Sequence, residues 1–69
     1  MPIIRVEIQE GRSPETKERL IAALTADAVE ILEVRPEQVR VLLYEIPQAH
    51  WGIAGQSVAR RDREKEAQQ

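Results

Sequence analysis

Hydrophobic and polar residues alternate at the beginning of the chain, which is the pattern of a β-strand with two different faces. Between residues 3 and 8, one face is fully apolar and the other includes two charged residues. The apolar face consists of Ile4, Val6 and Ile8. Residues 9–12 interrupt the alternation, and Gly11 favours a turn there. The pattern predicts a first strand over residues 3–8, followed by a turn.

The next segment has the signals of a helix start. Ser13 suits the N-cap, Pro14 suits the first helical position, and Glu15 places a negative charge at the positive end of the helix dipole. Apolar residues then recur with the spacing of one helix face, namely Leu20, Leu24, Ala28, Ile31 and Leu32, and Ile21 widens this stripe. Because Pro36 disfavours helix at the preceding residue, the helix is predicted to stop around residues 34–36.

Residues 39–46 are rich in β-branched and large apolar side chains, which predicts a second strand. The centre of this strand is apolar on both faces, as expected of a sheet that is covered on both sides. Strand, helix and strand together form a βαβ unit, so the two strands are predicted to be parallel neighbours. Residues 47–55 carry turn signals and can close into a short hairpin. The predicted fold class is therefore α/β (α+β).

The end of the chain is strongly polar from residue 59 onward and favours either a frayed helix or disorder. We therefore expect one domain over residues 1–61 and a charged tail over residues 62–69.

The chain has only 69 residues, which makes it marginal as an independent domain. It has no cysteine, which excludes disulfides, and its single histidine, His50, cannot form a metal cluster by itself. One helix covers only one face of a two-stranded sheet, so another subunit must cover the second face. The sequence therefore predicts an obligate oligomer.

Charge and hydropathy narrow the class of partner. The net charge of −2 and the isoelectric point near 5.4 argue against nucleic acid as the main partner. No apolar run approaches the length needed to span a membrane, and no signal-type segment opens the chain. We expect a cytoplasmic protein that does not bind membranes.

Pro2 is the first candidate for chemistry because it directly follows the initiator methionine. Removal of Met1 would turn Pro2 from an inert amide into a secondary amine on a rigid ring. In an apolar pocket near arginines, the pKa of such an amine falls, and the neutral form serves as a base near neutral pH. Many proteins begin with Met-Pro for no catalytic reason, and Pro2 taken alone favours that simpler interpretation.

Two arginines and the loop at residues 50–51 are further candidates. Arg40 lies within an aliphatic strand and must either reach the edge or bind an anion, whereas Arg12 lies in a turn, where most arginines are only solvated. Pro2 and Arg40 are expected near the same end of the sheet, and Arg12 at the opposite end. Trp51 can line an apolar pocket or fill a subunit interface, and His50 favours a structural role.

In combination these residues resemble the tautomerase superfamily, specifically its small 4-oxalocrotonate tautomerase type. The resemblance extends from Pro2 to about residue 61. The matching stretches are Pro2-Ile3, Glu10-Gly11-Arg12-Ser13, Val39-Arg40-Val41 and His50-Trp51-Gly52-Ile53. Each stretch by itself is weak evidence for this family, but the order and spacing of the four stretches in so short a chain are specific to it.

The resemblance implies a hexamer, built as a trimer of dimers in which each dimer shares a four-stranded sheet. It implies an isomerase that acts on 2-hydroxymuconate-like acids in the breakdown of aromatic compounds, with Pro2 as general base and no metal or organic cofactor. Arg12 would bind the carboxylate far from the reacting end. Arg40 of a different subunit would bind the 2-oxygen and its adjacent carboxylate, and Trp51 would help to keep the pKa of the amine low.

Some positions depart from the family pattern and leave alternatives open. Trp51 stands where tautomerases typically have phenylalanine, and Ala54 where they often have glycine. Relatives that hydrate or dehalogenate unsaturated acids use a carboxylate to activate water, and residues 51–55 contain no acid. A third alternative is a non-catalytic interaction module. The resemblance is compatible with a homohexamer or with a heterohexamer that includes a related chain.

Overall fold

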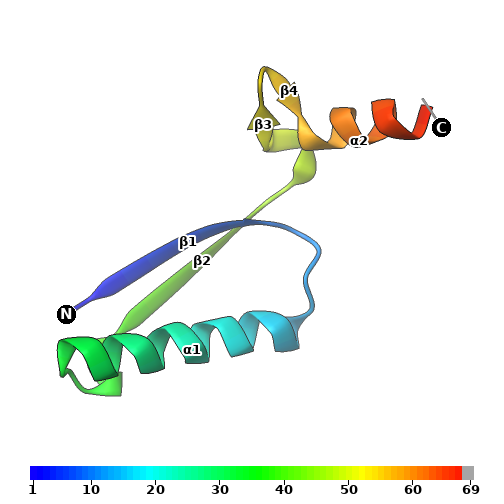
Figure 1. The fold of residues 1–69 in the computed structure, drawn as a ribbon. Coiled ribbons are helices and arrows are strands. Elements are labelled where there is room, and N and C mark those ends of the chain that lie inside the picture. The colour runs from blue at the N-terminus through cyan, green and yellow to red at the C-terminus, as the bar shows by residue number, and fades with distance from the viewer. Residues whose placement is uncertain (68–69) are drawn as a thin grey trace.

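The computed structural model describes residues 1–67 of the chain, and its first half is a βαβ unit (Figure 1). In order, this half contains strand β1 (Ile3–Gln9), helix α1 (Pro14–Leu32), the 3-10 turn η1 (Pro36–Gln38) and strand β2 (Arg40–Ile46). Strands β1 and β2 pair in parallel, with Ile3 opposite Arg40 and Gln9 opposite Ile46. The predicted strand–helix–strand order and the parallel pairing are both confirmed.

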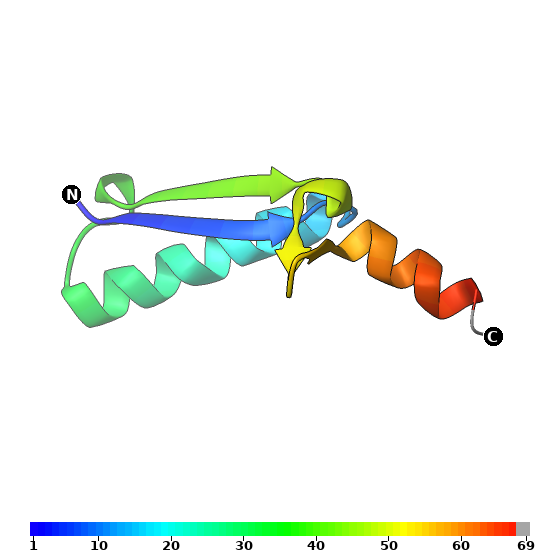
Figure 2. The same cartoon turned by 90° about the horizontal axis from the view of Figure 1, so that it is seen from above.

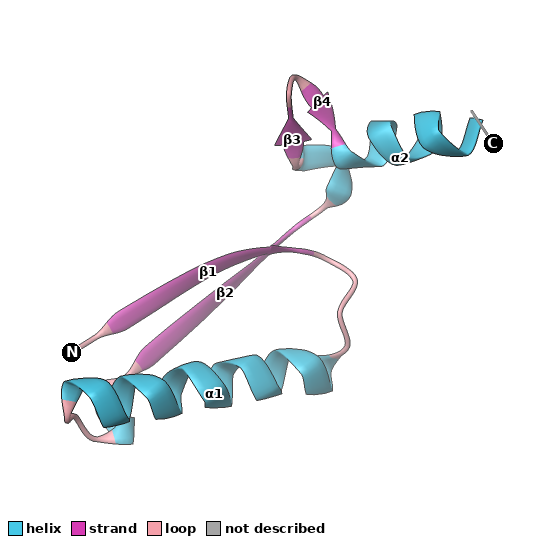
Figure 3. Ribbon diagram, viewed as in Figure 1, coloured by secondary structure: helices cyan, strands magenta, loops and turns pink. Residues whose placement is uncertain are grey.

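The second half forms a separate small unit beyond the carboxyl ends of the strands (Figures 1 and 3). It contains the 3-10 turn η2 (Gln48–His50), the hairpin strands β3 (Gly52–Ile53) and β4 (Gln56–Ser57), and helix α2 (Val58–Ala67). The short hairpin is thus confirmed. Most of the predicted charged tail is helical in α2, while residues 68–69 lie outside the described part of the chain.

The two-residue turn of the hairpin explains how Ala54 is tolerated in place of glycine. Ala54 and Gly55 both have left-handed backbone angles, with φ of 52° and 86°. Two consecutive residues with positive φ give the turn that best matches the twist of a tight hairpin. Alanine reaches this conformation at some conformational cost, so the departure from glycine does not prevent the hairpin from forming.

Helix α1 begins where the sequence predicts. The Ser13 hydroxyl accepts a hydrogen bond from the backbone N–H of Thr16 at 3.2 Å, and Pro14 occupies the first turn. The helix ends at Leu32 because Glu33 adopts a left-handed conformation, with φ of 55°. This end lies slightly before the predicted stop, since the αL residue, rather than Pro36, terminates the helix.

Replacing Ser13 with alanine is expected to lower the free energy of unfolding by about 1 kcal/mol, because the first turn of α1 loses its side-chain acceptor. Urea unfolding at one fixed protein concentration measures this change, since the stability of an oligomer depends on concentration. Ser13→Asn retains a capping oxygen and serves as the matched control. Equal stability of the alanine and asparagine variants would show that the cap contributes nothing.

The inner face of the sheet packs on α1, which lies along one side of both strands (Figure 2). The inner side chains form the registered pairs Ile4–Val41 and Val6–Leu43, and all four are half-buried. Toward the carboxyl end of the strands, Lys17 Nζ of α1 lies 2.7 Å from Glu45 Oε1 of β2. The helix is therefore joined to the sheet by apolar packing and by an ion pair near its amino end.

The outer face of the sheet is left open by the single chain. Ile3 is 64% exposed, Leu42 39% and Tyr44 44%, and the Arg5 guanidinium lies 5.6 Å from the centre of the Tyr44 ring. Side chains of these types are rarely left together in solvent unless another molecule covers them. As predicted, α1 covers only one face of the sheet within one chain. That another subunit covers the second face stays a prediction.

The far end of α1 is also uncovered. Ile31 is 75% exposed and Leu32 is 55% exposed, although both belong to the predicted apolar stripe. Among the residues whose side chains are described, Ala28 and Val39 alone form a buried apolar core. The apolar stripe is thus longer than the surface that one two-stranded sheet offers to it.

The dimensions of the chain also show that one chain alone leaves much of its surface uncovered. Its radius of gyration is 16.4 Å, whereas a compact chain of this length has a radius of about 11 Å. Its accessible surface is 5549 Å², whereas a folded monomer of this mass exposes about 4,400 Å².

Within the described residues, no helix is both long and apolar enough to cross a membrane.

Candidate active site

Pro2 and Arg40 lie side by side at the amino ends of the two strands. The backbone N–H of Arg40 donates to the Pro2 carbonyl oxygen at 3.0 Å, which continues the β1–β2 pairing by one residue. Arg40 is registered with Ile3, so its side chain lies on the outer face, while the half-buried Pro2 belongs to the opposite face. The structure therefore brings the two backbones together but directs the two side chains apart.

The Arg40 guanidinium folds back onto the η1 turn. Its Nη1 group donates to the Glu37 carbonyl oxygen and, at 3.5 Å, to the Val39 carbonyl oxygen. Within the described chain both bonds use Nη1, so the other guanidinium N–H groups stay available at an exposed position. An arginine held in this way presents a fixed fork of donors, which suits a carboxylate.

Pro2 gains an amine only when Met1 is removed. Met1 is 80% exposed, so the described part of the chain leaves this residue accessible. The hydrogen bond to Arg40 uses the carbonyl group of Pro2. Removal of Met1 therefore leaves the strand pairing intact while freeing the ring nitrogen.

Arg12 lies at the opposite end of the sheet. Gly11 adopts a φ of 119°, which side chains rarely allow, and this conformation reverses the chain after β1. Arg12 Nη1 then donates to the Gln9 carbonyl oxygen at 2.9 Å. The seven residues of β1 extend over about 23 Å, so Arg12 and Pro2 of one chain cannot contact the same small substrate.

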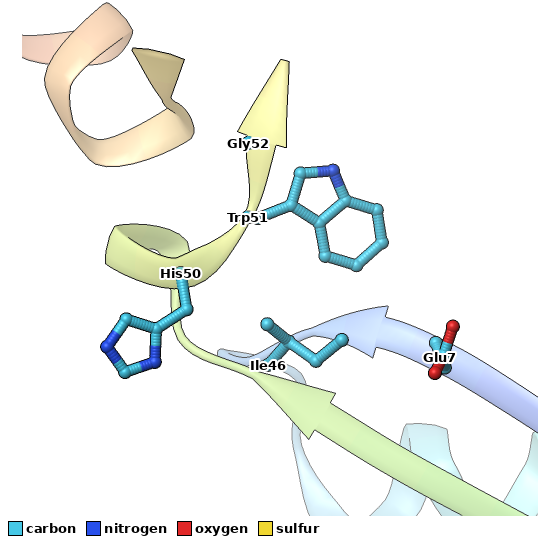
Figure 4. Close-up of a pocket in the computed structure, with 5 residues that line it drawn as sticks. All are labelled: Glu7, Ile46, His50, Trp51 and Gly52. Carbon is cyan, nitrogen blue, oxygen red and sulfur yellow. The ribbon is translucent and has the colours of Figure 1, made fainter. Parts of the chain in front are cut away.

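Trp51 also lies at this carboxyl end, where it forms one wall of a hollow of about 210 Å³. The other lining residues are Glu7, Ile46, His50 and Gly52. In Figure 4 the indole lies above the Ile46 side chain, on the side of Glu7, while the imidazole of His50 points away from it. Trp51 thus offers an apolar wall to this hollow, while its role in substrate binding stays a prediction.

A second hollow of about 210 Å³ lies between the end of β1, the hairpin and α2. It is lined by Gln9, Ile53, Val58, Arg61 and Asp62. Arg12 donates a hydrogen bond to the carbonyl oxygen of Gln9, one of these residues, but Arg12 itself does not belong to the lining. The carboxyl end of the sheet therefore combines apolar walls with at least two arginines.

Comparison with known proteins identifies the family. The profile of tautomerase enzymes matches residues 2–61. The chain belongs to the tautomerase family. Over 63 residues it is 40% identical to the 2-hydroxymuconate tautomerase of Pseudomonas putida, a match that covers 91% of this chain and 100% of that protein.

Solved structures agree with this assignment. TomN, a 4-oxalocrotonate tautomerase homologue of the tomaymycin biosynthetic pathway, is 47% identical, with a TM-score of 0.86 over 90% of this chain and 95% of that one. A heterohexameric 4-oxalocrotonate tautomerase from Chloroflexus aurantiacus is 39% identical, with a TM-score of 0.80 over 86% and 95% of the two chains. The protein is thus an isomerase of the 4-oxalocrotonate tautomerase type. The alternative of a non-catalytic interaction module is therefore not retained.

The structure divides the candidate residues of this tautomerase into two groups. Pro2 and Arg40 lie at the amino ends of the strands, and Arg12 and Trp51 lie at the carboxyl ends. Among the described residues, no three His, Cys, Asp or Glu side chains gather closely enough to hold a metal ion. A single chain of the tautomerase therefore holds two separate halves of the predicted constellation.

Several residues that line the two hollows of the tautomerase were not predicted from the sequence. Glu7 and Ile46 share the outer face of the sheet, which strand alternation could have indicated once the register was known. Gln9 ends β1 on the same face. Arg61 had no local signal, because its position depends on the direction in which α2 leaves the hairpin.

Proposed function

We propose that this tautomerase converts 2-hydroxymuconate-like dienols into their keto isomers, with the amine of processed Pro2 as general base. The main support is the location of Pro2 at one end of the strands and of Arg12, with an apolar Trp51 wall, at the other end, because antiparallel pairing of two copies through β1 would bring these two ends together. The similarity to the 2-hydroxymuconate tautomerase of Pseudomonas putida supports the choice of substrate.

In the proposed reaction, the neutral Pro2 amine takes the proton from the enol oxygen of the substrate. The electron pair of the broken O–H bond forms the carbonyl, and the conjugated π electrons shift toward a carbon of the chain. The protonated Pro2 then returns its proton to that carbon, so that the base is regenerated. This is general acid–base catalysis by one group, and it consumes no other reactant.

The two arginines are proposed to hold the two ends of the substrate. Arg12 binds the carboxylate far from the reacting end, and Arg40 binds the 2-oxygen with the adjacent carboxylate. Negative charge develops on that oxygen as the proton leaves, so a fixed guanidinium there lowers the barrier. Trp51 lines the pocket and excludes water from the amine.

One chain separates these groups, so the proposed site combines several subunits. β1 and β2 form a two-stranded sheet, so β1 has a free edge within the described chain. A second copy that pairs with β1 in the antiparallel sense places its Arg12 end beside the first copy's Pro2. Three such dimers would cover the exposed outer faces and form a hexamer. Since the face of Arg40 differs from that of Pro2, an Arg40 from a further subunit is favoured.

A second candidate reaction is the hydration of an unsaturated acid. The loop at residues 51–55 contains no acid, but Glu7 of β1 lines the same hollow as Trp51. A carboxylate in this position can take a proton from a water molecule as the oxygen of that water attacks the double bond. A protonated Pro2 then supplies a proton to the neighbouring carbon. This observation favours hydration more than the sequence alone does, yet the relatives favour tautomerisation.

The deciding experiment follows the ketonisation of 2-hydroxymuconate by ultraviolet absorbance, with protein whose intact mass shows that Met1 is absent. Rapid turnover by a single purified chain of hexameric size is expected. A hexamer that lacks this turnover but hydrates 2-oxo-3-pentynoate, an unsaturated acid, would favour the second candidate. A chain that reaches hexameric size only with a related partner would indicate a heterohexamer.

A further inference from the structure

The 3-10 turn η1 lies just before Arg40 in the chain and is closed by the side chain of Gln38. Gln38 is half-buried, and its Oε1 atom accepts a hydrogen bond from the backbone N–H of Arg35 at 3.0 Å. The backbone N–H of Gln38 donates in return to the Arg35 carbonyl oxygen at 2.9 Å. The two ends of the turn are thus joined by two hydrogen bonds, one within the backbone and one through the Gln38 side chain.

The same turn supplies an acceptor that orients the Arg40 guanidinium. Arg40 Nη1 donates to the carbonyl oxygen of Glu37, the middle residue of η1. The backbone of Arg40 is held separately, because its N–H donates to the Pro2 carbonyl oxygen at 3.0 Å. A long, exposed side chain that loses such an acceptor regains many rotamers. The direction of the guanidinium therefore depends on the shape of η1.

The two ends of η1 are restrained in different ways. At the carboxyl end, Val39 is buried, and its N–H donates to the Pro36 carbonyl oxygen at 3.1 Å. At the amino end, Arg35 is exposed, and the described chain offers its N–H the Gln38 Oε1 atom as acceptor. Loss of that acceptor frees the amino end of the turn, and with it the segment that carries the Glu37 carbonyl group.

We infer that Gln38 is a positioning residue, which closes η1 and so holds the Glu37 carbonyl oxygen where it orients the Arg40 guanidinium. This inference rests on the proposed function, in which Arg40 binds the 2-oxygen of the substrate and the adjacent carboxylate. A guanidinium stabilises developing charge best when it is oriented before the reaction begins, because no reorganisation is then needed. Gln38 acts through Arg40 and does not have to touch the substrate.

Glu37 offers a matched control on the same turn. Its carbonyl oxygen belongs to the backbone and is kept in any variant, whereas its side chain is 76% exposed and its Oε2 atom lies 4.0 Å from Arg35 Nε. An exposed ion pair at this distance contributes little. Glu37→Gln therefore changes the turn chemically but leaves its hydrogen bonds in place, while Gln38→Met keeps the length of the side chain and removes its acceptor.

The kinetic test is a double-mutant cycle with Arg40. Gln38→Met is expected to lower kcat/KM for 2-hydroxymuconate about fivefold, the factor that corresponds to one net hydrogen bond, and Glu37→Gln to stay within about twofold of the wild type. In an Arg40→Ala background, Gln38→Met is expected to have no further effect, because the group that it positions is absent. An equal loss in both backgrounds, as a merely structural role predicts, would overturn the inference, and so would no loss in either.

A measurement without substrate separates this inference from the proposed function. Nitrogen-15 relaxation reports the order of the arginine Nε–H groups in the intact oligomer. In Gln38→Met the order parameter of Arg40 is expected to fall below about 0.6, the range of flexible groups. In Gln38→Glu, which keeps an acceptor oxygen, it is expected to stay near the wild-type value. Arg12, which donates to the Gln9 carbonyl oxygen at the other end of the sheet, is the internal control and is expected not to change.

The outcomes of the relaxation experiment are distinct from those of the activity assay. Were the wild type inactive on 2-hydroxymuconate while Arg40 still lost order in Gln38→Met, the substrate would be wrong and the positioning role of Gln38 would stand. An Arg40 side chain that stays ordered in a folded Gln38→Met oligomer would refute that role, whatever the activity.

Discussion

Replacing Pro2 with alanine is expected to reduce kcat/KM for 2-hydroxymuconate by about a hundredfold or more, the range in which a general base contributes. Alanine leaves an amine at the terminus, but it is a primary amine on a freely rotating bond rather than a secondary amine on a fixed ring. Pro2 precedes β1, and its carbonyl oxygen keeps the bond from Arg40, so the fold is expected to be unchanged. Steady-state kinetics on protein of verified mass and hexameric size measures the loss.

Two controls make this result specific to the amine. Pro14→Ala changes a proline at the first turn of α1, far from the terminus, and is expected to retain activity near that of the wild type. An uncleaved extension before Pro2 acylates the ring nitrogen, and because Met1 is exposed, it is expected to remove activity without loss of fold. Full activity in the acylated protein would show that another group is the base.

The strands and α1 could be predicted because each follows from local patterns. The alternation over β1, the Ser13 cap with Pro14, and the apolar run of β2 all act within one segment. The parallel pairing followed from the length of the crossover helix. These features placed Pro2 and Arg40 at one end of the sheet before the structure was known, and the hydrogen bond between their backbones agrees with that placement.

The hollows could not be predicted, because they depend on packing between segments that are distant in the sequence. Gln9 and Arg61 are 52 positions apart in the chain and line one space only because α2 follows the hairpin past the end of β1. The exposure of Ile31 and Leu42 has a similar origin. Their side chains fit a buried pattern, yet the surfaces that would bury them belong to other subunits in the proposed assembly.

Mixing two impaired variants is expected to restore activity at substrate concentrations well below KM, because the proposed site takes Pro2 and Arg12 from different subunits. Pro2→Ala lacks the base, and Arg12→Ala lacks the donor for the distal carboxylate. In subunits mixed in equal amounts by unfolding and refolding together, a site receives an intact Pro2 in half of cases and an intact Arg12 in half of cases. About a quarter of the sites are then complete, as expected for random assembly of a symmetric oligomer.

The expected rate of the mixture is therefore about a quarter of the wild-type rate, while each variant refolded alone stays near its own low rate. Native mass spectrometry verifies that the mixed oligomers contain both variants. Mixed oligomers with no recovery would mean that Pro2 and Arg12 of one chain serve the same site. The length of β1 argues against that outcome, since about 23 Å of strand separates the two residues and exceeds the reach of a six-carbon diacid.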